Sequence, residues 1–210
     1  MRFVDARGHL DRIQDYSAGI FGFAATLLVL NLSVPPIHVP WTQSFDELLK
    51  EWPKFAVFAL SFVSIGQIWV SYRRMFACFR AADQTLLWLN IALLLFVVTL
   101  PFFTGLVGTW ASDPVLARIA AAAYGSVWAI ASAIQTGMWR YASSHRKALL
   151  RPEISVAGIR RMTVRLTIGP VMYAVFTIVA AFSFYASMAG FVALTLFYML
   201  PHAELDPVKP

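Results

Sequence analysis

The sequence predicts an all-α, polytopic membrane protein with six transmembrane helices per subunit and a cytoplasmic N-terminus. Three observations predict this class. First, 59% of the 210 residues are hydrophobic and only 13% are charged, against roughly 25% charged in a typical soluble domain. Second, the hydrophobic residues gather in uncharged runs, and a helix needs about 20 such residues to cross a bilayer core. Third, the basic residues lie in the short segments between those runs.

The apolar runs define the expected spans. They lie at about residues 17–34, 55–72, 86–110, 115–140, 166–184 and 186–200. Pro35 and Pro36 are expected to end the first span, and Pro101 is expected to kink the third. A single helix over 166–200 would be roughly 52 Å long, against a core of about 30 Å. Two helices with a turn between residues 184 and 190 are therefore expected. The chain is predicted to be one transmembrane domain, 1–210, with a basic cytoplasmic loop at 141–165.

Charge fixes the expected orientation. The first apolar run continues past signal-peptide length without a small-residue cleavage pattern, so we expect a first span and not a cleaved leader. With the N-terminus inside, all of the 17 lysines and arginines except Lys50, Lys54 and Arg118 fall on the cytoplasmic side. This bias orients the first four spans and barely constrains the last two. It also accounts for the net charge of +6 without a nucleic-acid partner.

Ionisable and catalytic groups are missing from the predicted spans. His9, His38, His145 and His202 all lie outside them, and no Asp or Glu lies inside one. Proton-coupled transporters usually place such groups within the membrane, where each is costly. The single cysteine, Cys78, excludes an internal disulfide. Metal spacings, nucleophile motifs and phosphate loops are also absent. We therefore expect no catalytic residues, no cofactor and no enzymatic activity.

The first span carries a helical stripe of uncharged residues. Gly19, Phe23, Thr26 and Leu30 fall at i, i+4, i+7 and i+11, on one face of a helix. From spacing alone, such a stripe is more often ordinary helix packing, because small residues let helices approach closely. If several copies surrounded a shared axis, each residue of the stripe would form a ring. In order along the helix these would be a ring of small residues, a bulky apolar ring, a ring of hydroxyls and a second apolar ring. Spacing leaves both interpretations open.

The segment from Arg12 to Leu28 also resembles a family signature. The potassium channel family called transmembrane protein 175 (TMEM175) opens with arginine, three variable residues, Phe-Ser-Asp-Gly and an apolar run ending in Thr-Leu-Leu. The second and third spans are similar to those of the same family. The matching residues are Arg12, Ser17, Gly19, Thr26, Leu27 and Leu28, then Trp69, Arg74, Phe76, Arg80, Asp83 and the runs 86–90 and 100–102.

The resemblance implies a homotetramer whose first helices line a central pore. Gly19, Phe23, Thr26 and Leu30 would then face the axis. Phe23 and Leu30 would form hydrophobic constrictions that hold a pore shut by dewetting, and potassium would pass transiently near the Thr26 hydroxyls. The implied function is passive conduction of potassium and other monovalent cations in a bacterial plasma (inner) membrane. The implied partners are these ions, the lipid bilayer and three further copies, with no nucleic acid.

Five polar residues are predicted to brace the pore helix from the cytoplasmic side. They are Arg12, Ser17, Trp69, Asp83 and Asn90. Asn90 lies within a span, where an unpaired amide is costly, so a hydrogen-bond partner is expected. For Arg12 and Asp83, which lie near the membrane boundary, solvated helix ends are the alternative.

The chain departs from the family pattern at several positions. Ala18 replaces the family aspartate, Tyr16 replaces phenylalanine, and Tyr72 and Arg73 stand where the family tends to carry histidines. A non-conducting structural membrane protein is therefore one alternative function. A secondary transporter or permease is another, although the lack of intramembrane charge and of an evident inverted repeat weighs against it.

Overall fold

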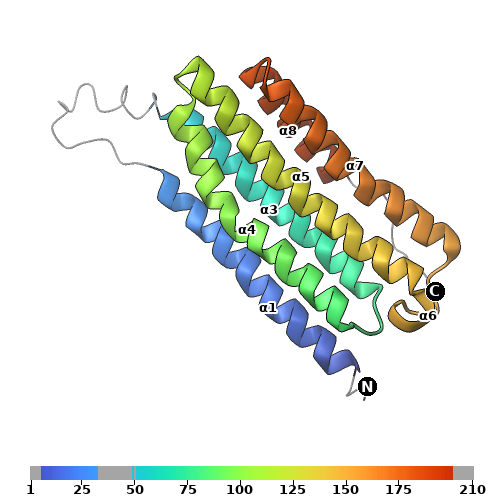
Figure 1. The fold of residues 1–210 in the computed structure, drawn as a ribbon. Coiled ribbons are helices and arrows are strands. Elements are labelled where there is room, and N and C mark those ends of the chain that lie inside the picture. Colours follow the sequence, from blue (N-terminus) through green and yellow to red (C-terminus); the bar gives the residue numbers. More distant parts are fainter. Residues whose placement is uncertain (1–5, 33–48, 50, 201–210) are drawn as a thin grey trace.

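The computed structural model describes residues 6–32, 49 and 51–200, and this part of the chain is almost entirely helical. Figure 1 shows long helices lying side by side, with a short helix at one end of the bundle. The elements are α1 (Ala6–Leu27), the 3-10 helix η1 (Leu28–Asn31), α3 (Trp52–Ala77), α4 (Gln84–Trp110), α5 (Pro114–Ser144), α6 (Arg146–Leu149), α7 (Val156–Ala180) and α8 (Phe184–Met199).

The helices form a layered bundle with α1 at one edge. In the described part of the chain, α1 packs only against η1, α3 and α4. Helix α5 lies between α4 and α7, and the α7–α8 hairpin forms the opposite edge (Figure 1). Within the described residues, five helices are long and apolar enough to cross a membrane, namely α1 with η1, α3, α4, α5 and α7. The predicted all-α polytopic class is confirmed.

The C-terminal apolar stretch consists of two helices, α7 and α8. The turn between them covers residues 181–183, just before the predicted window of 184–190. Ser183 places the turn there, because its side chain accepts a hydrogen bond from the Ala186 amide and caps α8. Helix α8 has 16 residues, about 24 Å, which is shorter than a bilayer core of about 30 Å. A count of six full spans therefore stays a prediction.

The helices extend beyond the apolar runs that predicted them. Helix α5 continues to Ser144, and α7 begins at Val156, where the Ser155 side chain accepts from the Gly158 amide at 3.0 Å. Arg160 and Arg161 therefore lie on a helix and not in the expected loop of 141–165. An apolar run in the sequence indicates the part of a helix that is buried in lipid. The helix itself continues for as long as its backbone hydrogen bonds continue. Pro35 and Pro36 lie outside the described residues.

The two inter-helix connections at one end of the bundle are joined by backbone hydrogen bonds. Phe79 and Leu150 form an isolated antiparallel bridge. The Arg80 amide donates to the Leu149 carbonyl at 2.8 Å, and the Arg151 amide donates to the Cys78 carbonyl at 3.0 Å. The α3–α4 connection is thereby fixed to the α5–α7 connection. These bonds bury Cys78 completely.

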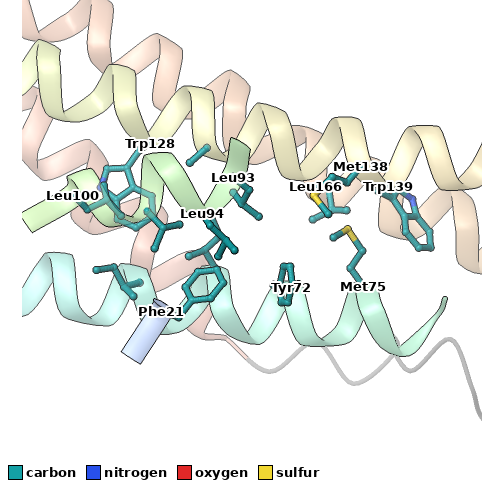
Figure 2. Packing of buried hydrophobic residues seen from close by; sticks show 14 of the residues in the cluster. Phe21, Tyr72, Met75, Leu93, Leu94, Leu100, Trp128, Met138, Trp139 and Leu166 are labelled. Carbon is teal, nitrogen blue, oxygen red and sulfur yellow. The ribbon is translucent and has the colours of Figure 1, made fainter. Parts of the chain in front are cut away.

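A continuous core of apolar and aromatic side chains runs through the bundle. Figure 2 shows Phe21 and Tyr72 on one side and Trp128, Trp139 and Leu166 on the other, all within the same cluster. Trp128 stacks on Tyr173 of α7 with ring centroids 5.6 Å apart. The Trp139 indole N–H donates to the Thr163 hydroxyl at 2.9 Å. These aromatic contacts fix α5 against α7, so the bundle provides a rigid support for α1.

The reactivity of the Cys78 thiol provides a test of the packing at this end of the bundle. Burial raises the pKa of its thiol to about 11, although the nearby Arg151 charge lowers it in part. At neutral pH this leaves about a hundredfold less thiolate than in an exposed cysteine. We expect maleimide to label native Cys78 about a hundredfold more slowly than the detergent-denatured chain, as followed by gel shift. A Cys78→Ala, Ser144→Cys variant places an exposed thiol at the same end. Equal labelling rates for the two native proteins would contradict the packing.

Candidate pore-lining helix and the residues that hold it

The predicted pore-lining stripe is exposed along the outer face of α1 and of η1, the 3-10 helix that carries Leu30. Gly19, Phe23, Thr26 and Leu30 are all exposed in the isolated subunit, with Phe23 at 60% and Leu30 at 76%. The Thr26 hydroxyl donates to the Phe23 carbonyl at 2.8 Å. The structure thus places the four residues together on one uncharged surface of a membrane helix. Thr26 presents its oxygen lone pairs there, because its hydrogen is already donated.

The opposite side of α1 attaches the helix to the subunit. The buried residues are Leu10, Ser17, Phe21, Ala24 and Leu28, at spacings of three, four and seven. At 3.6 residues per turn, this stripe lies about 160° around the helix from the exposed one. Ordinary packing within the subunit therefore uses one face of α1 and leaves the predicted pore face without a partner in the described chain.

Ser17 is the polar centre of this attachment. The Tyr72 hydroxyl donates to Ser17 Oγ at 2.9 Å, and Asn90 Nδ2 donates to the same oxygen at 3.1 Å. Ser17 Oγ in turn donates to the Ile13 carbonyl at 2.7 Å. A hydroxyl has one hydrogen and two lone pairs, so every hydrogen-bonding position of Ser17 is used. Three helices, α1, α3 and α4, meet at this single oxygen.

This hydrogen-bonded cluster is buried inside the subunit. Ser17, Tyr72 and Asn90 are 0%, 1% and 3% exposed. The Tyr72 ring also packs between Phe21, at 5.6 Å, and Phe76, at 4.3 Å between ring centroids. Asn90 Oδ1 is buried and has no hydrogen-bond partner among the described residues. The cluster therefore holds α1 from one side, and its hydrogen bonds are shielded from bulk solvent.

Of the five predicted bracing residues, the structure brings Ser17 and Asn90 together and places the other three elsewhere. Arg12 is exposed, with no hydrogen bond or ion pair to the residues that the structure describes. Trp69 is half-buried and carries the Arg73 guanidinium 5.2 Å from its ring centroid. Asp83 caps α4 by accepting from the Leu86 amide at 2.9 Å. It also accepts from the Tyr141 hydroxyl of α5 at 2.7 Å.

Two residues that help attach the first helix to the subunit are not predicted from the sequence. In the sequence, Tyr72 is notable only as a departure from the family pattern, yet in the structure its hydroxyl is the second hydrogen-bond donor to Ser17. Asn31 anchors the far end of the segment, where its Nδ2 donates to the Pro101 carbonyl of α4 at 2.8 Å. Gly105 permits this contact, because a Cβ there would overlap the Asn31 carboxamide. A polar side chain at the edge of an apolar run was the available signal for Asn31.

Together, the fold and this face define a multi-pass helical membrane protein whose first helix carries an uncharged surface that residues 6–32, 49 and 51–200 leave uncovered. Residues 12–101, which include the first helix and the Ser17 cluster, match the family model described as endosomal/lysosomal potassium channel TMEM175. This part of the chain is therefore similar to a family of potassium channels.

Similar proteins cover nearly the whole chain. A protein of Streptomyces collinus named as a potassium channel is 28% identical over 89% of this chain and 90% of its own length. One of Chamaesiphon minutus, also named as a potassium channel, is 29% identical over 90% of this chain and 93% of its own. The crystal structure of a lysosomal potassium-selective channel TMEM175 homolog from Chamaesiphon minutus matches with a TM-score of 0.82 and 28% identity. It covers 91% of this chain and 96% of that one.

The hydrogen bonds of the Ser17 cluster predict which variants of its residues lose more stability. Ser17→Ala would leave the Tyr72 hydroxyl and the Asn90 amide buried without their acceptor, whereas Tyr72→Phe removes one donor only. An unsatisfied buried group costs about 1–3 kcal/mol, more than the net loss of one bond. We expect Ser17→Ala to lower the thermal unfolding midpoint in detergent more than Tyr72→Phe does.

Ser126→Ala provides the matched control for this series. Ser126 is half-buried in α5, and its hydroxyl donates to the Ala122 carbonyl of its own helix at 2.7 Å. Its removal breaks no contact between helices. A Ser17→Ala protein as stable as Ser126→Ala would show that the cluster does not hold α1.

Proposed function

We propose that the chain forms a potassium-permeable cation channel in which four copies surround an axis and α1 of each copy lines the ion path. The observation that carries this proposal is the exposed, uncharged stripe of α1, on the side opposite its attachment to the subunit. The potassium channel names of the relatives support the choice of ion. Four is the number of copies implied by the family resemblance. The bacterial relatives favour a bacterial plasma membrane as the location.

Two residues of the stripe provide the proposed constrictions. Phe23 and Leu30 carry the large apolar side chains of the exposed face. A ring of such side chains excludes water from a narrow pore and so raises the barrier for an ion. The phenyl ring is the bulkier of the two, so we place the narrowest point at Phe23. No charge or metal site is needed for this kind of gate.

Thr26 provides the proposed polar contact between the constrictions. It follows Phe23 by about 4.5 Å along the helix. Because its hydrogen is donated to the Phe23 carbonyl, its oxygen is oriented to accept contacts from outside the helix. Four such oxygens would replace part of the hydration shell of a potassium ion. The selectivity would be weaker than that of carbonyl rings, which surround an ion with more oxygens.

A small cavity in the subunit, lined by both polar and apolar residues, bears on the permease alternative. It lies between α3, α5, α7 and α8, is lined by Gln67, Gln135 and Tyr198 among others, and has a volume of about 50 Å³. Solute sites are usually about 300–1,000 Å³, and a water needs about 10–15 Å³. The cavity is therefore of a size for a few waters and not for a transported solute.

Thr26→Ala tests the polar contact. The variant keeps the helix but removes four oxygens from the proposed path. We expect the preference for potassium over sodium in proteoliposome flux to fall by up to about tenfold, the change that about 1.4 kcal/mol of differential contact produces. Thr99→Ala is the control, because the Thr99 hydroxyl of α4 donates to the Phe96 carbonyl at 2.8 Å in the same local geometry. Equal preferences in the two variants would remove Thr26 from the ion path.

Phe23→Ala tests the constriction. Removing the phenyl ring widens and rehydrates the narrowest point, so we expect a larger single-channel current and a higher open fraction in planar bilayers. Phe102→Ala is the control, because Phe102 is 67% exposed on α4 and lies away from the stripe. Unchanged current in Phe23→Ala would place the ring outside the pore. Slow counterflow without current in the parent protein would instead indicate a carrier.

A further inference from the structure

A second feature of the subunit lies far from α1, at the end of the bundle where α8 stops. A groove of about 520 Å³ opens there between α3, α7 and α8, within the range typical of ligand sites. Its walls come mainly from apolar side chains, including Phe62, Val63, Val70, Met162 and Met199. Phe62 and Met199 are 51% and 58% exposed. The groove is therefore an apolar surface that the described part of the subunit leaves open.

The length of α8 explains the groove. With 16 residues against 26 in α3 and 25 in α7, α8 covers only part of the space between them. The Tyr198 hydroxyl fixes its end by donating to the Arg165 carbonyl of α7 at 2.9 Å. From Phe62 to Arg74 the groove follows α3 for about 18 Å, close to the depth of one leaflet, since the whole core is about 30 Å.

Two arginines stand at one end of this apolar groove. Arg74 of α3 and Arg165 of α7 both line it, together with the Tyr198 ring, which the Arg165 guanidinium approaches at 5.7 Å from the centroid. Arg165 Nη1 is buried without a hydrogen-bond partner among the described residues. No acidic side chain is among the described residues that line the groove. Two like charges and an unused guanidinium N–H favour an anion with several oxygens.

We propose that the groove binds an anionic glycerophospholipid, with its phosphate between Arg74 and Arg165 and an acyl chain along α3 and the end of α8. The charges match a phosphodiester, and the apolar walls match a hydrocarbon chain lying along the membrane normal. In the predicted orientation this end of the bundle is cytoplasmic, so the lipid belongs to the inner leaflet. A free anion would use the arginines and leave the apolar walls uncovered. The lipid satisfies both halves of the groove.

Phosphatidylglycerol is the probe, with phosphatidylcholine as the uncharged comparison. Native mass spectrometry of the purified full-length protein measures how many of each lipid stay bound. We expect phosphatidylglycerol to be retained in preference, and the affinity to fall about fivefold for each arginine removed in Arg74→Gln/Arg165→Gln. Arg140→Gln/Arg160→Gln removes the same charge from exposed positions that do not line the groove. That variant should bind as the parent does.

Gly66→Leu tests the groove without touching a charge. Gly66 lines the groove, and a Cβ added there meets nothing within 4 Å, so the new side chain should fill the acyl site and weaken retention. Gly137→Leu, at a similarly open position on α5, should not weaken retention.

Equal retention of phosphatidylglycerol and phosphatidylcholine by the parent would overturn the proposal. So would a loss of binding in both the test variant and its control, whether in the arginine pair or in the glycine pair. Two other outcomes would overturn it as well. One is lipid binding only after removal of residues 201–210, which carry Glu204 and Asp206. The other is loss of assembly without loss of lipid in Arg74→Gln/Arg165→Gln.

Discussion

The rotation of α1 about its own axis decides which residues face outward, and lipid cannot set that rotation. Hydrocarbon tails are as apolar as leucine, so apolar contacts hold a membrane helix in place only weakly against turning. Here polar bonds perform this task. Ser17 accepts from α3 and from α4, and Asn31 donates to α4 about 21 Å further along. Two anchors on one side fix both the rotation and the height of α1, and the face of Phe23 and Thr26 is directed outward as a consequence.

Hydropathy predicted the class, the approximate spans and the division of the last apolar stretch into α7 and α8. It did not predict where the helices end, because Ser144 and Val156 lie in polar segments whose backbone remains hydrogen-bonded. The exposed stripe of α1 was one of two interpretations that the spacing left open. Only the contacts of α1 with α3 and α4 show that the other side of the helix is used for packing within the subunit.

The bracing residues show the limits of the sequence more sharply. A buried amide requires a partner, so the sequence predicts one for Asn90, but only the structure shows that this partner is Ser17. Trp69 and Asp83 belong to the same predicted cytoplasmic-side network, but no requirement for a partner of this kind links them to Ser17. Whether a residue belongs to the cluster depends on how its helix is rotated about its axis. Because α3 and α4 are apolar on nearly all sides, no contrast between a polar and an apolar face reveals which way each residue points. Asp83 turned out to serve α4 and α5 as a cap and a link to Tyr141.

The same geometry gives meaning to two departures from the family pattern. Ala18 is exposed on α1, so the loss of the family aspartate changes the outward surface and leaves the Ser17 cluster intact. Tyr72 stands where the family resemblance places a histidine, and it occupies the cluster itself. Serine, tyrosine and asparagine carry no group that titrates between about pH 5 and 8, whereas histidine does. The Ser17 cluster in this chain therefore has no group of its own that changes charge across that range, so any effect of pH on the position of α1 would have to arise outside this cluster.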